Sequence, residues 1–134
     1  MPQPPQLATT RLVLDAFQAT DAQSLFNYAS RPAVAKWMAW EQHRILKDSR
    51  DALNFLMRGA PGQYDWAIRL RASDELVGGF SFFLNSATTA EIHFTVAEPH
   101  WGRGLATEAG HAVLAWAWSH HADLGSISTA PVAE

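Results

Sequence analysis

A glycine loop between a strand pattern and a helical pattern is the part of this sequence best suited to chemistry. The strand pattern covers residues 90–96, and Gly102-Arg103-Gly104 precede the helical pattern. The first N–H groups of a helix have no partner within the helix and lie at the positive end of its dipole. Glycines let the backbone approach an anion closely, and Arg103 adds a positive charge. The loop therefore predicts a phosphate or pyrophosphate site, with a plain turn as the alternative.

Two side chains on the preceding strand can act as proton acceptors. Alternate residues share one face of a strand, so Glu91, His93 and Thr95 lie together, toward a cleft or toward solvent. A carboxylate, directly or through a water, can deprotonate an attacking amine, and the reference pKa of histidine is near neutrality. Glu91 is the first candidate base and His93 the second. A solvated polar face without a role is the alternative.

The glycine loop resembles the acetyl-CoA loop of the GNAT acetyltransferase superfamily, whose signature is Gln/Arg-x-x-Gly-x-Gly/Ala. Residues 101–106 occupy the six positions, and Trp101 departs from the Gln or Arg of the first. The form Trp-Gly-Arg-Gly-x-Ala-Thr-Glu-Ala is similar to the ribosomal-protein N-acetyltransferase (RimJ/RimL-type) branch. Thr10-Arg11-Leu12-Val13-Leu14 also looks like the first strand of that branch. The resemblance covers nearly the whole chain and stops only at its C-terminus.

The resemblance implies acetyl-CoA as cosubstrate and assigns roles by position. Val96 matches the residue whose backbone contacts pantetheine and the thioester carbonyl, and Glu91 lies on the strand that carries an acidic base in many members. Trp40 and Glu41 fall in the region that overhangs the acceptor site, although a helical tryptophan is usually a core residue. The positions expected to hold the cofactor are Val96, Trp101, Gly102, Arg103, Gly104, Leu105, Ala106 and Thr107.

The implied activity is acetyl transfer to a primary amine by direct attack in a ternary complex. A protein N-terminal α-amine is the expected acceptor, and small amines, including antibiotics and polyamines, remain open because a fold does not fix a substrate. A non-catalytic acyl-CoA-binding or interaction module is the alternative, and a purely structural subunit is a third. The family continues with a further helix and hairpin after the position of residue 134. We therefore expect a C-terminally short domain with an open edge strand, and either further residues or a homodimer.

Periodicity predicts a mixed α/β fold. Strand patterns cover residues 11–17, 64–70, 76–84, 88–96 and 124–130, and the last two strands flank a long helix over 103–121. Thr20 is the expected N-cap of the first of three earlier helices. The sheet should be antiparallel at first, ending in a parallel strand pair around the crossover helix; the resemblance implies that this pair splays apart and that the last helix and hairpin are lacking. Residues 1–8 are expected to be a flexible tail, and residues 9–134 a single domain.

Composition restricts the classes of partner, cofactor and location that the chain could have. The chain has 134 residues, a net charge of −3 and 48% hydrophobic residues, which is typical of a globular domain. Without a basic cluster or a long apolar run, neither nucleic acid nor a membrane is an expected partner. The absence of cysteine excludes disulfides and a cysteine nucleophile and is compatible with a cytoplasmic location. The spacing of the six histidines predicts no metal site, and Glu108, in the first helical turn, is expected to be structural.

Overall fold

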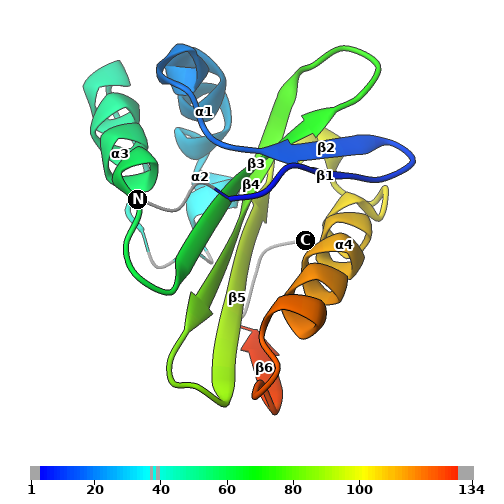
Figure 1. Ribbon diagram of the computed structural model, residues 1–134. Coiled ribbons are helices and arrows are strands. Elements are labelled where there is room, and N and C mark those ends of the chain that lie inside the picture. The colour runs from blue at the N-terminus through cyan, green and yellow to red at the C-terminus, as the bar shows by residue number, and fades with distance from the viewer. Residues whose placement is uncertain (1–3, 37, 39, 130–134) are drawn as a thin grey trace.

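The structure is a computed structural model that describes residues 4–36, 38 and 40–129. Its strands are β1 (Leu7–Ala8), β2 (Leu12–Asp15), β3 (Gln63–Leu70), β4 (Leu76–Leu84), β5 (Thr89–Val96) and β6 (Ser126–Thr129). Its α-helices are α1 (Ala22–Ala29), α2 (Pro32–Ala35), α3 (Leu46–Arg58) and α4 (Leu105–His120), and the short 3-10 helices are η1 (Ala19–Asp21) and η2 (Glu98–His100). Figure 1 shows these elements around one sheet.

The strands lie in the sheet in the order in which they occur in the chain. Pairs from β1 to β5 are antiparallel, and β6 runs parallel to β5 after the crossover through α4. The expected mixed sheet with a parallel last pair is therefore confirmed. The pairing of β5 with β6 extends from Thr89 to Ile92 among the described residues. The second half of β5 thus extends beyond the described part of β6, which ends at Thr129, as Figure 1 shows.

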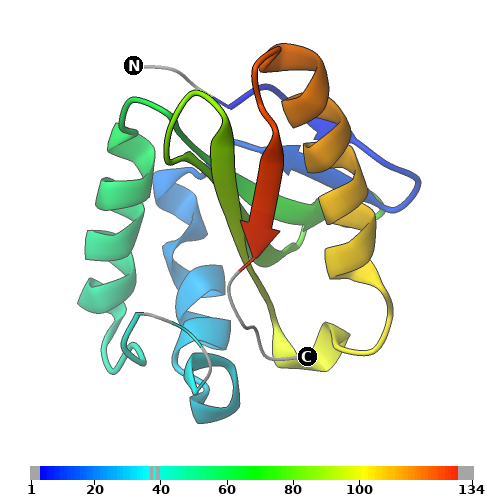
Figure 2. The same ribbon diagram turned by 90° about the horizontal axis from the view of Figure 1, so that it is seen from below.

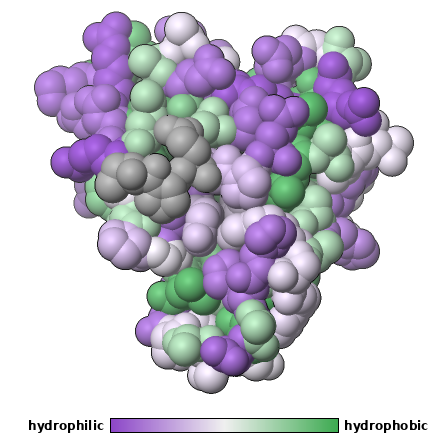
Figure 3. All heavy atoms as spheres, viewed as in Figure 1, coloured by the Kyte–Doolittle hydropathy of each residue, from purple (hydrophilic) through white to green (hydrophobic). Residues whose placement is uncertain are grey.

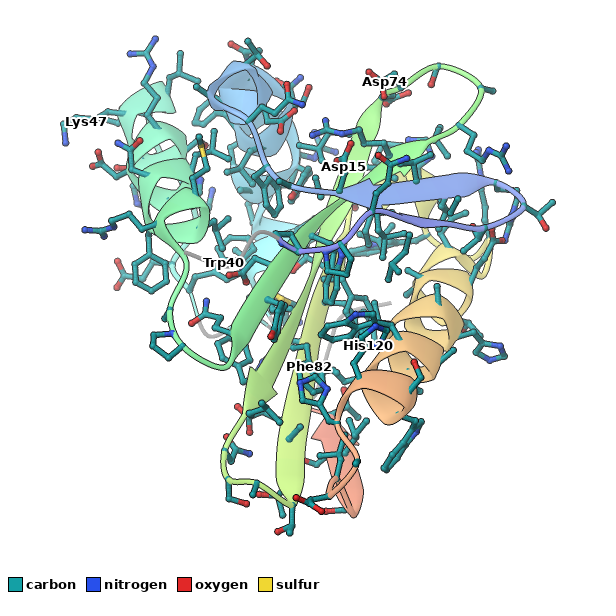
Figure 4. The ribbon with its side chains drawn as sticks, viewed as in Figure 1. Asp15, Trp40, Lys47, Asp74, Phe82 and His120 are labelled. Carbon is teal, nitrogen blue, oxygen red and sulfur yellow. The ribbon has the colours of Figure 1, made fainter. Side chains whose placement is uncertain are left out.

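Helices cover both faces of the sheet, with α1 and α3 on one side and α4 on the other (Figure 2). Strand alternation produces the two hydrophobic layers, because Trp66 and Ile68 of β3 pack in the α4 cluster while Ala67 packs in the α1–α3 cluster. Figure 4 shows the same separation, with Phe82 and His120 on the α4 side and Trp40 on the α1–α3 side. The sheet therefore separates two helical layers that can each form a cavity against it.

A close approach of backbones fixes β4 against β5 at their junction with the glycine loop. Gly78 pairs with Val96, and the pairing of β3 with β4 shifts between Ile68 and Arg69. A Cβ built on Gly78 would lie 2.1 Å from the backbone oxygen of Thr95. Only glycine fits at this position, because any larger residue would collide with the backbone of β5.

The structure corrects three expectations about the N-terminal half. Leu7–Ala8, expected within a flexible tail, forms β1 against β2, and Trp66 Nε1–H donates to the Pro5 carbonyl at 2.7 Å. The first long strand spans Leu12–Asp15 rather than residues 11–17. Thr20 does not cap a helix, because η1 precedes α1 and the Asp21 carboxylate accepts the Gln18 N–H at 2.7 Å. Two expected positions, Trp37 and Ala130, lie outside the described residues.

Candidate functional site

The glycine loop encloses a cavity of about 630 Å³ between the end of β5 and the start of α4. Seven of the eight expected cofactor positions line this loop cavity, and the eighth, the exposed Arg103, does not. Sequence reasoning missed two further lining residues, Phe94 and His100. The seven expected positions that line the cavity are Val96, Trp101, Gly102, Gly104, Leu105, Ala106 and Thr107.

The loop backbone has the conformation that glycine permits. Gly102 and Gly104 have φ of 79° and 74°, which is the left-handed region. A Cβ on Gly102 would meet no atom within 4 Å, so the space beside it is open. Gly104 is the N-cap of α4, and no side chain caps this helix end. The first N–H groups of α4 are therefore available to an anion at the positive end of the helix dipole.

The end of β5 presents backbone hydrogen-bonding groups on its β6 side, beyond the last described pair of the two strands. In an antiparallel pair, hydrogen-bonded and non-hydrogen-bonded residue pairs alternate. Ala97 N–H donates to the Val77 oxygen at 2.7 Å, so Thr95 and Ala97 face β4, while Phe94 and Val96 direct their backbone groups toward β6. Trp101 Nε1–H donates to the Val96 carbonyl at 2.7 Å. This bond ties the unusual first residue of the loop to the strand and leaves the Phe94 groups and the Val96 N–H facing outward.

Glu108 joins α4 to the first hairpin and so positions the loop. Its carboxylate accepts hydrogen bonds from the Thr9 hydroxyl, from the Arg11 N–H at 2.9 Å and from Arg11 Nε–H at 2.7 Å. Arg11 Nη1–H also donates to the Arg103 carbonyl at 3.0 Å. Partial burial acts to raise the pKa of Glu108, but these hydrogen bonds outweigh it and hold the pKa below its usual range. Glu108 was expected to be structural, and its hydrogen bonds to Thr9 and Arg11 hold the start of α4 and the glycine loop against the first hairpin.

His100 provides an independent indication that the loop cavity accommodates a ligand. It lines the cavity, its side chain is only 12% exposed, and its Nε2 lies 3.4 Å from Glu75 Oε2. Its Nδ1 is buried and has no hydrogen-bond partner among the described residues. Buried polar atoms are normally satisfied. Free loop amides, open space beside Gly102 and this polar atom together fit a polyanionic ligand such as the pyrophosphate arm of CoA.

The two base candidates form a pair on the opposite face of β5. Glu91 Oε1 lies 2.8 Å from His93 Nε2, and both side chains are partly exposed. The His93 ring also packs edge-on against Phe83 at 5.2 Å. His93, but not Glu91, lines a second cavity of about 510 Å³ under α1 and α3. The carboxylate therefore contacts the imidazole, and the imidazole contacts the cavity.

The two expected acceptor-side residues are placed differently. Trp40 lines the cavity under α1 and α3, whereas Glu41 is exposed and does not line it. Both lie in the connection between α2 and α3. Phe94 lines both cavities and marks the place where they meet at β5.

Other ionisable clusters in the described residues have structural explanations. Arg69 is buried between Asp15 and Asp21, at 2.8 and 2.7 Å, and joins β3 to β2 and η1.

Within the described part of the chain, no three histidine or carboxylate side chains are arranged to hold a metal ion. In residues 4–36, 38 and 40–129, no helix has the length and apolar character needed to cross a bilayer.

Comparisons with known proteins agree with this geometry. A family model for the acetyltransferase (GNAT) domain matches residues 11–132. The uncharacterized N-acetyltransferase p20 of Bacillus licheniformis is 30% identical over 109 residues, which cover 77% of this chain and 60% of that protein. The chain thus spans about three fifths of the length of this curated relative.

Solved structures share the fold. The GNAT-family acetyltransferase from Bacillus anthracis has a TM-score of 0.81 at 23% identity, covering 92% of this chain and 72% of that one. The microcin C7 self-immunity acetyltransferase MccE, solved with acetyl-CoA and AMP, has a TM-score of 0.72 at 19% identity, covering 83% and 64%. Because the family model matches nearly the whole chain, from the first hairpin through the glycine loop, the chain belongs to the GNAT acetyltransferase family.

Proposed function

We propose that this chain provides the catalytic domain of an N-acetyltransferase that transfers the acetyl group of acetyl-CoA to a primary amine. The observation that carries the proposal is the loop cavity, where uncapped amides of α4 lie beside the outward-facing backbone of Phe94 and Val96. The amides would bind the pyrophosphate, and the strand edge would pair with the pantetheine amides. This position would bring the thioester to the part of β5 that separates the two cavities.

The reaction requires a base and a donor near β5. The amine nitrogen attacks the thioester carbon, a C–N bond forms, the C–S bond breaks, and the thiolate leaves. If His93 Nε2 carries the proton shared with Glu91, Nδ1 is free to accept the proton of the amine. Glu91 then orients His93 and stabilises the imidazolium that forms. The outward-facing Val96 N–H is placed to stabilise charge on the carbonyl oxygen.

Two finer expectations remain proposals. The acceptor is a protein N-terminal α-amine, as the loop and first-strand sequences suggest by their similarity to the ribosomal-protein branch. The domain assembles as a homodimer. An apolar cavity on the acceptor side of β5 is compatible with a peptide end, because it accepts a side chain next to the attacking amine.

The test is release of free thiol from acetyl-CoA with a panel of peptides and small amines, with product identified by mass spectrometry. A general base typically contributes ~10²–10⁴-fold, so His93→Ala should lower kcat by about that factor. His111→Ala is the matched control, because His111 is exposed on α4 and lines neither cavity. Binding of CoA without transfer to any amine would instead support the non-catalytic acyl-CoA-binding module.

A further inference from the structure

We infer that the cavity under α1 and α3 selects a primary amine whose neighbouring carbon bears an aromatic or branched aliphatic group and which carries no second positive charge. The inference rests on the proposed function and specifies its acceptor. The cavity has a volume of about 510 Å³, which falls within the range of roughly 300–1,000 Å³ that is usual for small-molecule sites. We call it the acceptor cavity.

Two helices and two strands give the acceptor cavity apolar walls. The lining residues of α1 are Leu25, Tyr28 and Ala29, and those of α3 are Ala52, Phe55 and Leu56. Each set has the spacing of one helical face. Phe83 of β4 and Phe94 of β5 contribute from the sheet, and Trp40 contributes from the connection before α3.

The entrance at Phe55 combines an aromatic ring with a positive charge, because the Arg58 guanidinium lies 5.8 Å from the ring centroid. Phe55 is 57% exposed although it lines the cavity, and it is one of few large hydrophobic side chains that face solvent. Figure 3 shows a largely hydrophilic surface over the α3 side of the molecule, with apolar residues in small patches. An exposed aromatic side chain beside an apolar cavity is therefore a local feature, and it favours entry of an apolar group.

Three polar side chains of the lining, those of Ser81, Thr95 and His43, have partners in the protein. Ser81 Oγ–H donates to Asp65 Oδ1 at 2.5 Å, and Thr95 Oγ1–H contacts Met38 Sδ at 3.1 Å. His43 Nδ1 lies 2.8 Å from Ser49 Oγ. These three side chains therefore offer little hydrogen-bonding capacity to a polar substituent, which would lose its water beside them without gaining a partner.

The described lining contains no Asp, Glu, Lys or Arg. Burial lowers the pKa of His43 despite nearby Asp48, so this imidazole is neutral near pH 7. The buried carboxylate of Asp65 is not in the lining and accepts hydrogen bonds from Ser81 and from Gln63 Nε2 at 2.8 Å. A second ammonium on the acceptor would therefore be buried without a counter-charge, which is strongly unfavourable.

The acceptor cavity lies next to the residues that we propose take part in the reaction. His93 lines the acceptor cavity, and Phe94 lines both it and the loop cavity. An apolar group held between α1 and α3 would therefore leave its amine beside β5, within reach of His93 and of a thioester at the end of the strand. Polycations such as polyamines would lack this placement.

The experiment compares kcat/KM for phenylalaninamide, glycinamide and spermidine under the same acetyl-CoA concentration. Burial of the phenyl group should give phenylalaninamide an advantage of about ten- to a hundredfold over glycinamide, and spermidine should be the poorest acceptor. Tetrapeptides that begin with Phe or Gly distinguish a free amine from a polypeptide end as the source of the same chemistry. Equal values for the three small amines would overturn the inference while leaving acetyl transfer intact.

Two variant pairs test the cavity itself. Ala52→Phe should fill it and remove most of the phenylalaninamide advantage, whereas Ala115→Phe, on the exposed side of α4, should not. Phe55→Asp places a carboxylate at the entrance and should raise kcat/KM for spermidine at least tenfold above that of Phe55→Asn. No difference within either pair would contradict the inference.

A readout independent of turnover separates the two proposals. Calorimetry with N-acetylphenylalaninamide, the expected product, should show binding to the parent and to Ala115→Phe but not to Ala52→Phe. This pattern in a chain that transfers no acetyl group would refute the proposed function and support the acceptor cavity. Turnover with unchanged product binding in Ala52→Phe would do the reverse.

Discussion

Gly102→Ala is the substitution that most cleanly separates folding from CoA binding. The new Cβ would meet no protein atom within 4 Å, so the cost to folding comes from φ of 79° alone. A non-glycine residue in the left-handed region costs about 1–2 kcal/mol, which lowers the thermal midpoint by several degrees in a domain of this size. The methyl group would occupy the space through which a phosphate must approach the loop amides.

Gly102→Ala should weaken CoA binding strongly while the domain stays folded. A hydrogen bond to a charged group contributes about 1.5–3 kcal/mol, so the loss of one amide–phosphate bond weakens CoA binding by roughly ten- to a hundredfold. Calorimetry with CoA measures the dissociation constant, and thermal unfolding without ligand measures the stability.

Gly62→Ala is the control, because it imposes the same backbone cost elsewhere. Gly62 has φ of 76°, and its oxygen accepts the N–H of Leu84, at the end of β4 opposite to the Gly78–Val96 pair. That separation along the strand is about 20 Å. Gly62→Ala should lose stability and retain CoA affinity. If Gly102→Ala binds CoA as tightly as the parent, the loop is not the pyrophosphate site.

Two further predictions concern the elements that hold the loop. Hydrogen bonds from Thr9 and Arg11 lower the pKa of Glu108 against the effect of partial burial, so this carboxylate stabilises the fold above its usual pKa, and the stabilisation is lost as the pH falls through the lowered pKa. Glu108→Gln should therefore be less stable than the parent near pH 7, and the difference between their thermal midpoints should shrink toward about pH 3; a constant difference would mean that the charge is irrelevant. Gly78→Ala should lower the free energy of unfolding by more than the ~1 kcal/mol typical of point mutations, because its Cβ would lie 2.1 Å from the Thr95 oxygen. Denaturant unfolding measures the loss, and a change under ~0.5 kcal/mol would refute the close approach.

Local patterns were sufficient to predict most of the sheet and the position of the loop. The bounds of β4 match the predicted residues 76–84, and α4 begins within two residues of the predicted start. Strand alternation also placed Glu91 and His93 on one face of β5, where their side chains lie 2.8 Å apart. These features depend on residues that are neighbours in the sequence, so the periodicity of hydrophobic residues is sufficient to predict them.

Features formed by distant residues could not be predicted. The Arg11–Glu108 bond joins residues 97 positions apart, and no local pattern indicates it. The two-residue strand β1 is too short for alternation to detect. Glu41 was proposed because the corresponding region of the resembling family overhangs the acceptor site, but its side chain is exposed and does not line the cavity. The acceptor cavity depends on the spacing between α1, α3 and the sheet, which periodicity does not specify.

The most direct test of the account is a backbone-amide NMR titration of this chain with CoA. We expect the largest shifts for Gly102, Gly104 and Ala106 in the loop and for Phe94 and Val96 at the end of β5, with little change at Gly62. Shifts in this set would place the pyrophosphate on the loop and the pantetheine along the strand edge. Saturable binding that leaves these amides unchanged and shifts a different surface would contradict the central claim.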